Sequence, residues 1–437
     1  MLRFAGPATL ALLLWAPLGA QPTDPPPDPS SLRLGALLDT LAARSPRLQA
    51  ARATAGAAGA RVDEASTLPD PMVQLGVMNV GLPEFNADMP ASMAPSVQLM
   101  QRIPFPGTLG LRGDVAEATH RMAEAGADET WWELRNQASD LFYDLYSLDG
   151  RIVVMRETLG LLESFRTVAR ALYAAGEGAQ ADVLRADVEV VRMDGEIRTM
   201  EAMRTAAAAR LNGLLDRPAG TPVAPPVLDP LPAAIPDTDT MLAWARESRP
   251  LLRRDRTAVD RAEVGTALAR KTIWPDFTVG VTYGQRDRGA GTERMGSAVI
   301  GFTLPIHAGA RQYAAREEAE AALRRATADL TASRAEVSSR IGVLVAELET
   351  AGTLIDLYRT GILPEARATV ESALSSYRVG GVDFMTLVDA EMAANRYESE
   401  LVDLFADYGR AVAGLESTLG RPLPRSTSIL APAPEHR

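Results

Sequence analysis

The chain has 437 residues, of which 46% are hydrophobic and 23% are charged; this suffices for two domains or one large elongated body and excludes disorder of the whole chain. Its net charge of -11 argues against nucleic acid as a partner, because phosphates would repel it. With no cysteine and three histidines, the chain has neither a disulfide nor a Cys nucleophile, and we expect no histidine-rich metal centre and no cofactor.

Residues 1–20 have the pattern of a secretory signal peptide. Arg3 precedes a short apolar run over 10–15, and small residues follow up to Ala20. A membrane anchor is the alternative, but this run is shorter than the ~18 to 20 apolar residues that span a bilayer. We therefore expect export, a cleaved signal peptide and a proline-rich segment over 21–34, with no cysteine to carry a lipid anchor.

The rest of the sequence contains one unit twice, related by a shift of 204 residues (250 − 46). The matching pairs are Pro46 and Pro250, Pro71 and Pro275, Gly76 and Gly280, Tyr173 and Tyr377, Gly176 and Gly380, Ala186 and Ala390, and Arg217-Pro218 and Arg421-Pro422. Duplication predicts repeat 1 over 35–218, a proline-rich linker over 219–238, repeat 2 over 239–422 and a C-terminal tail over 423–437.

Each repeat is predicted to begin with a helix, over 35–67 and 239–272, which ends before a proline. The hydrophobic period then becomes two: in the segment 277–284, apolar residues alternate with Thr and Gly, which is typical of a strand with one apolar face. We predict one β-hairpin per repeat, with strands at 71–80 and 95–104, and at 275–284 and 297–305. The polar segments 81–92 and 285–296 are expected to be the exposed loops.

A long helical hairpin should follow in each repeat, over 109–216 and 309–420. Its first helix in repeat 1 would have roughly 65 residues and a length of about 100 Å, far above the mean for globular proteins. Gly160 and Pro364 occupy matching positions and predict a break in both repeats. Gly176 and Gly380 should end the long helices, and Asp182 and Asp383 should cap the returning ones.

Four strands from one chain cannot close a barrel, and open sheet edges are not tolerated in hydrocarbon. Two copies would supply 8 strands and three would supply 12, since the smallest membrane barrels have about 8 and even numbers are usual. The residues alone leave that choice open.

This organisation resembles the TolC-like outer membrane efflux family. The resemblance covers nearly all of the chain after the signal, and includes the Tyr-x-x-Gly turns, Asp182-Val-Leu-Arg-Ala186 and Leu387-Val-Asp-Ala390. It implies a mainly α fold with membrane β, in which a homotrimer forms a 12-stranded β-barrel and a 12-helix α-barrel. The first hairpin, from Leu68-Pro-Asp-Pro-Met72 to Ile103-Pro-Phe-Pro-Gly107, looks like the heavy-metal-export branch in particular.

The resemblance also implies a function and partners. The chain would be a passive exit duct in the outer membrane of a Gram-negative bacterium, extending into the periplasm. Its partners would be outer-membrane lipid, a periplasmic adaptor and an inner-membrane transporter of the resistance-nodulation-division type. The alternative from the residues is a periplasmic adaptor with a coiled-coil hairpin, although an adaptor should carry one hairpin and not two. The chain contains no Gly-rich phosphate loop, HExxH or Gly-x-Ser-x-Gly motif, so an enzyme is not expected.

Three groups of residues are candidate sites. The adaptor-docking tips would include Tyr173, Gly176, Gly178, Tyr377, Gly380 and Gly381, whose glycines also serve simply to end helices. A threefold ring of Asp383, Asp389 and Glu391 would attract cations at a periplasmic gate, the alternative being a helix cap and a solvated face. The thioethers of Met72, Met78, Met89, Met93 and Met100 suit Cu(I), the alternative being adaptable packing.

Overall fold

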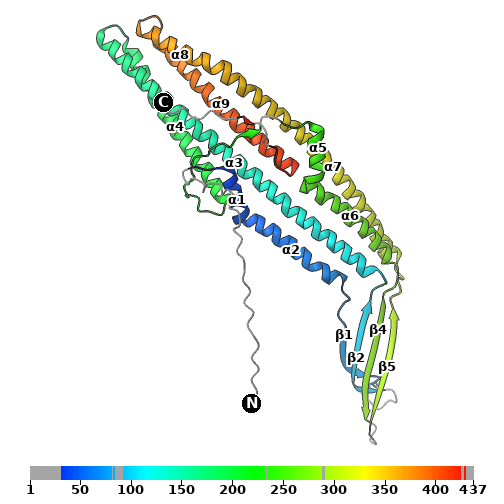
Figure 1. Cartoon of the computed structure of the whole chain (residues 1–437). Coiled ribbons are helices and arrows are strands. Elements are labelled where there is room, and N and C mark those ends of the chain that lie inside the picture. Colours follow the sequence, from blue (N-terminus) through cyan, green and yellow to red (C-terminus); the bar gives the residue numbers. More distant parts are fainter. Residues whose placement is uncertain are drawn as a thin grey trace, which may run out of the picture.

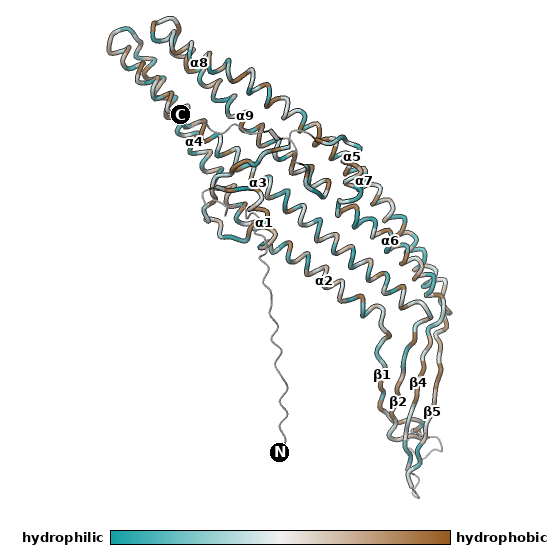
Figure 2. Tube along the Cα trace, viewed as in Figure 1, coloured by the Kyte–Doolittle hydropathy of each residue, from teal (hydrophilic) through white to brown (hydrophobic). Residues whose placement is uncertain are grey.

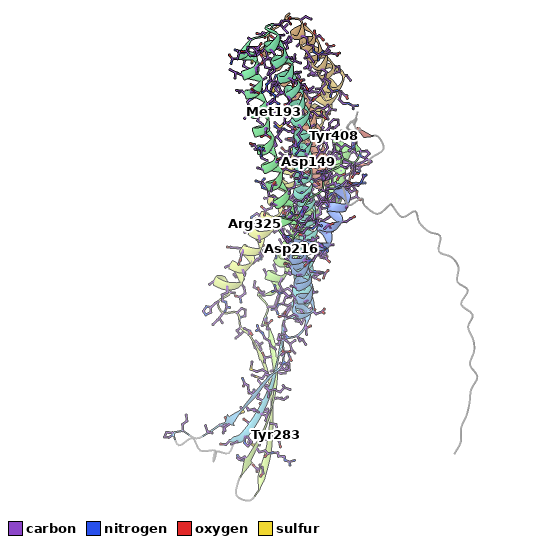
Figure 3. All side chains as sticks on the ribbon, turned by 90° about the vertical axis from the view of Figure 1, so that its left-hand side faces the viewer. Asp149, Met193, Asp216, Tyr283, Arg325 and Tyr408 are labelled. Carbon is purple, nitrogen blue, oxygen red and sulfur yellow. The ribbon has the colours of Figure 1, made fainter. Side chains whose placement is uncertain are left out.

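The computed structural model describes residues 31–80, 82–83, 92–232, 235–287, 291–424 and 428–429. The predicted signal peptide, Met89 and most of the C-terminal tail lie outside these residues. The molecule is elongated, with a small sheet at one end and two helical tips at the other (Figure 1). Figure 3 labels Tyr283 in the sheet and Met193 in the tip half of the molecule. No helix in the described ranges combines the length and the apolar character needed to cross a membrane.

The N-terminal part of each repeat is split into two helices by a proline. In repeat 1, α1 spans Leu34–Arg44 and α2 spans Pro46–Ser66; in repeat 2, α5 spans Thr238–Ser248 and α6 spans Pro250–Lys271. The prediction of one helix over 35–67 and one over 239–272 is therefore wrong. A residue before proline is kept out of the helical region, whereas proline itself fits the first helical turn. Ser45 adopts ψ 115° and its hydroxyl accepts the Leu48 N–H, which caps α2.

Strands β1 (Met72–Met78), β2 (Met93–Ile103), β4 (Phe277–Asp287) and β5 (Thr292–Phe302) form an antiparallel sheet in the order β1-β2-β4-β5. The pairing of β2 with β4 joins the two repeats. The expected loop over 285–296 is largely wrong, because β4 and β5 continue through it and pair Gln285 with Arg294 and Asp287 with Thr292. The charges of Arg286 and Glu293 form an ion pair across the strands, so these polar residues support the ladder.

The helical hairpin of repeat 1 consists of α3 (Thr108–Ala175) and α4 (Gln180–Leu214). In repeat 2, a π-helical turn (Gly309–Tyr313) leads into α7 (Ala314–Leu357), a second π-helical turn (Tyr358–Ile362), α8 (Leu363–Arg378) and α9 (Phe384–Leu419). A break thus occurs near Pro364 but not at Gly160, where α3 is continuous. Proline lacks the N–H that a regular helix needs, whereas glycine keeps it.

The linker between the repeats packs against the middle of the helices. Its β3 (Leu231–Pro232) pairs with β6 (Ser428–Ile429) from the C-terminal tail, and Leu32 forms a parallel bridge with Pro226. The Tyr408 hydroxyl from α9 donates a hydrogen bond of 2.6 Å to the Pro232 carbonyl. Both ends of the described chain therefore meet the linker at one level of the molecule.

Two hydrophobic clusters hold the helices together. One lies at the middle, where α9 meets α3 and α7, and includes Phe142, Leu344 and Phe405. The other lies toward the tips and includes Phe165 and Leu387. Each fully buried Leu or Phe contributes about 1.5–3 kcal/mol, so these clusters dominate the packing energy. Figure 2 shows hydrophobic and hydrophilic residues interspersed along the helices, as amphipathic packing requires.

Candidate functional site

One face of the sheet is apolar and exposed over all its strands. The register aligns Val73, Leu99 and Val281 in one row, and Ile103, Phe277 and Phe302 in another. Leu75 is 77% exposed and Ile300 is 78% exposed, values far above those of a packed core. An exposed apolar face of this extent marks a surface that an apolar environment covers.

The opposite face carries mainly polar and small residues, together with several methionines, Val299 and the charged Arg102, Arg286 and Glu293. Gln74, Gln98, Thr282 and Ser297 form one cross-strand row there, and no charged residue belongs to it. Thr282 and Ser96 on this face are buried, whereas the apolar residues of the other face are exposed. Strands of membrane barrels alternate apolar and polar residues in this way.

The described methionines of the first hairpin lie on this polar face as two cross-strand pairs. Met72 is opposite Met100, and Met78 is opposite Met93. Met93 also covers Gly284, where a Cβ atom would lie 2.6 Å from its sulfur. Six residues of strand separate the pairs, about 20 Å, so the structure does not bring the four sulfurs together. Among the residues described, no group of three or more His, Asp or Glu could hold a metal ion.

Each level of the molecule has one free edge from each repeat. No described strand pairs with the outer edge of β1 or of β5. Next to the sheet the helices follow the order α2, α3, α6, α7, and toward the tips the order α4, α3, α9, with α7 and then α8 beyond (Figure 1). The α4 edge exposes an apolar stripe of Leu184, Val188 and Val191 at helical spacing.

The first tip is a tight glycine turn between α3 and α4. Gly176 has a φ of 79° and its N–H bonds to the Tyr173 carbonyl at 3.0 Å, while the Gly178 N–H bonds to the Leu172 carbonyl at 3.1 Å. Tyr173 is 49% exposed at this turn. The predicted cap at Asp182 is wrong: α4 begins at Gln180 after Ala179, and Asp182 lies in its first turn, where a carboxylate favours the helix dipole.

The second tip has the same backbone but a different surface. Gly380 has a φ of 73°, and the Gly381 N–H bonds to the Ser376 carbonyl at 2.8 Å. Tyr377 is buried and packs edge-on against Phe384, with ring centroids 5.6 Å apart. Burial, and secondarily the charge of Asp182, raises the pKa of Tyr377. The two tyrosines at matching positions are therefore not equivalent, because only Tyr173 presents its ring to solvent.

The three carboxylates of the suggested gate lie in three different environments. Asp383 is the N-cap of α9 and accepts the Thr386 N–H at 2.8 Å and its hydroxyl at 2.6 Å, which lowers the pKa of Asp383. Asp389 is exposed. Glu391 is buried between α9 and α3, accepts a hydrogen bond from Thr158, and has its pKa raised by burial. The structure does not gather them on one surface.

Thr158 and Asn395 belong to the Glu391 site but were not predicted. The Asn395 side-chain amide donates to the Thr158 hydroxyl at 2.9 Å across the interface of α3 and α9. Asn395 follows Glu391 by four residues and shares its helix face, which packs on apolar neighbours. Two polar residues on an otherwise apolar stripe are a sequence signal for a buried polar contact.

Comparisons with known proteins agree with this geometry. The family model described as outer membrane efflux protein matches residues 37–217 and 242–421. The solved outer-membrane channel OprN is 20% identical, with 90% of each chain covered and a TM-score of 0.73. The outer membrane protein VceC from Vibrio cholerae is 16% identical, covering 89% of this chain and 96% of its own, with a TM-score of 0.76. CusC is 15% identical with a TM-score of 0.75, covering 89% of this chain and 92% of its own. No curated protein matches the chain in sequence.

Proposed function

Because the chain belongs to the outer membrane efflux protein family, we propose that it is the protomer of an exit duct in the outer membrane of a Gram-negative bacterium. The family consists of passive channels, and the chain is not an enzyme. The observation that carries the proposal is the sheet, with an exposed apolar face for lipid and a polar face for an aqueous lumen. A periplasmic adaptor has no use for such a sheet.

Several copies are needed to close the duct. A sheet with free edges at β1 and β5 leaves N–H and C=O groups that hydrocarbon cannot satisfy. Pairing β5 of one copy with β1 of the next removes both edges, and three copies give 12 strands, as in the family that the sequence resembles. The exposed stripe on α4 supports the same head-to-tail ring, since the α7 and α8 edge of the next copy would cover it.

The tips are proposed to dock a periplasmic adaptor, which joins the duct to an inner-membrane transporter. The exposed ring of Tyr173 supports a contact at the first tip, whereas the buried Tyr377 supports a structural role at the second. For a gate, the exposed Asp389 is the better candidate, because Asp383 caps a helix and Glu391 is covered.

The cargo proposed from the first hairpin is a soft metal cation such as Cu(I). In support, both methionine pairs lie on the lumen side and not on the lipid side, where thioethers would serve packing alone. The uncharged row of amides and hydroxyls between the pairs favours no sign of charge and would equally pass organic cargo. Transport assays with Ag(I) and with the Met72→Leu and Met100→Leu variants test the metal; unchanged silver tolerance in cells would contradict it.

The function itself is tested by conductance. The purified protein in a planar bilayer should give discrete steps of current, and the assembled species should resist mild detergent and dissociate on boiling. A water-soluble monomer that never changes the current would contradict the duct.

A further inference from the structure

The chain contains a single lysine, Lys271, although it has 45 Lys and Arg residues in total. Lys271 is the last residue of α6, directly before the segment that enters β4. It therefore lies between the end of α6 and the start of β4, where the helices meet the sheet (Figure 1). All the other residues among these 45 are arginines, so a lysine at the junction of the helices and the sheet is unusual for this chain.

The ammonium sits in a small aromatic site. Its Nζ lies 5.7 Å from the centroid of the Phe105 ring and donates a hydrogen bond of 3.1 Å to the Pro106 carbonyl. The Phe105 ring stacks on that of Trp274, with centroids 5.4 Å apart and planes at 16°. Trp274 is 57% exposed. The Lys271 ammonium therefore lies beside two stacked aromatic rings, of which Trp274 is exposed.

The neighbouring cations are already paired, whereas Lys271 is not. Arg102 binds Asp276 at 2.7 Å and Arg270 lies 3.5 Å from Glu320, but no carboxylate among the described residues pairs with Lys271. An ammonium has three donors, and Pro106 occupies one. At least one positive charge with spare donors therefore remains at this level.

The site lies away from the strand edges at which copies are proposed to pair. It lies on the segments that end β2 and begin β4, the two inner strands of the sheet, and so is remote from the β1 and β5 edges. The row of Ile103, Phe277 and Phe302 continues the apolar face from the sheet to this point.

We propose that Phe105, Lys271 and Trp274 form a binding site for the headgroup phosphate of a glycerophospholipid in the inner leaflet of the membrane. The proposal rests on the proposed function, since it requires the sheet to span a bilayer. Aromatic rings gather at membrane interfaces, and a lysine binds phosphate as a compact point charge. Acyl chains would follow the apolar face while Lys271 holds the phosphate, which fixes the depth of the duct.

The single lysine makes the test direct, because an amine-reactive reagent can label one side chain only. The labelling rate of Lys271 is measured by peptide mass spectrometry, which separates it from the N-terminal amine. Three settings are compared: vesicles of phosphatidylglycerol, vesicles of digalactosyldiacylglycerol, which has no phosphate, and detergent with or without inorganic phosphate.

We expect labelling to be about tenfold slower in phosphatidylglycerol than in the galactolipid, because a bound phosphate engages the ammonium. Trp274→Ala should remove most of that difference, while Arg325→Ala, an exposed position on α7, should leave it unchanged (Figure 3). Equal rates in the two lipids would overturn the proposal, as would equal protection by inorganic phosphate in detergent. Flotation of the protein with both vesicles reports separately on membrane insertion, and hence on the proposed function.

Discussion

At the scale of single residues, the carboxylates near the second tip show how the fold changes the meaning of a charge. Glu391 is a charged residue near a turn, for which the sequence favours exposure, yet it is only 4% exposed under α3. Asp383 remains at the surface, where its carboxylate accepts a hydrogen bond from the Thr386 N–H at the start of α9. The two groups should therefore respond to pH in opposite directions.

Replacing Glu391 with Gln should stabilise the protein at neutral pH. Burial raises the pKa of Glu391 above its ordinary value of 4.5. At pH values between 4.5 and the raised pKa, the folded state therefore binds more protons than the unfolded state. Its contribution to stability then falls as pH rises from about 4.5 through the raised pKa. Thermal unfolding of wild type and Glu391→Gln should converge on acidification and diverge toward neutral pH. A constant gap between them would contradict the buried-acid interpretation.

Replacing Asp383 with Ala should loosen the start of α9, because the Thr386 N–H loses the side chain that caps it. Because the pKa of Asp383 is lowered, its contribution is present above the ordinary value of 3.8 and is lost as pH falls through the folded pKa. Hydrogen exchange at the Thr386 N–H measures the effect. Asp383→Ser should keep most of the protection, since serine also caps helices.

At the scale of elements, the sheet gives adjacent residues opposite surroundings. Leu75→Arg would place a charge on the apolar face, and Gln74→Arg would place it on the polar face one residue away. Leu75→Arg should lower the stability of the folded protein in the membrane by about 2–4 kcal/mol at a position near the bilayer midplane. Gln74→Arg should lower it much less. The amount of assembled protein in outer membranes is the measurement. An equal loss of assembled protein for both variants would contradict the assignment of the apolar face to lipid and of the polar face to the lumen.

The same elements show what the sequence can predict. Alternation near 277–284 predicts a strand and its apolar face, because the side-chain period is local. The sequence does not predict the extension of β4 to Asp287, because Arg286 and Glu293 are stabilised by a partner strand that local composition does not reveal. The repeat aligns Pro46 with Pro250, and each of these prolines begins a helix. The sequence does not show that a separate short helix ends just before each of them.

The candidate site was less predictable than the fold. Gly176 and Gly380 could be assigned to turns, since each needs a left-handed conformation. The burial of Glu391 arises from contact with α3, which is far away in sequence, whereas Tyr377 packs against Phe384 of the helix that follows it. Glu391 and Asn395 lie four residues apart on an apolar helix face, which is a local signal for a buried polar contact, but no local pattern distinguishes Tyr173 from Tyr377.

At the scale of the whole molecule, every level ends in one edge from repeat 1 and one from repeat 2. A heterologous contact of this kind either closes into a ring or continues as a filament. The twist of the sheet and the fit of the helices decide how many copies close it. A duct forms only if this contact closes into a ring.

Disulfide trapping between β1 and β5 tests it most directly, because the chain has no cysteine of its own. Cysteines are placed in turn along 73–77 of β1, each with Ile300→Cys on β5. Within one copy these edges are three strand spacings apart, roughly 14 Å, whereas a disulfide needs Cα atoms within about 7 Å. Oxidation in membranes should give covalent dimer and trimer and nothing larger. Monomer at every register, or an open-ended ladder, would contradict the closed ring.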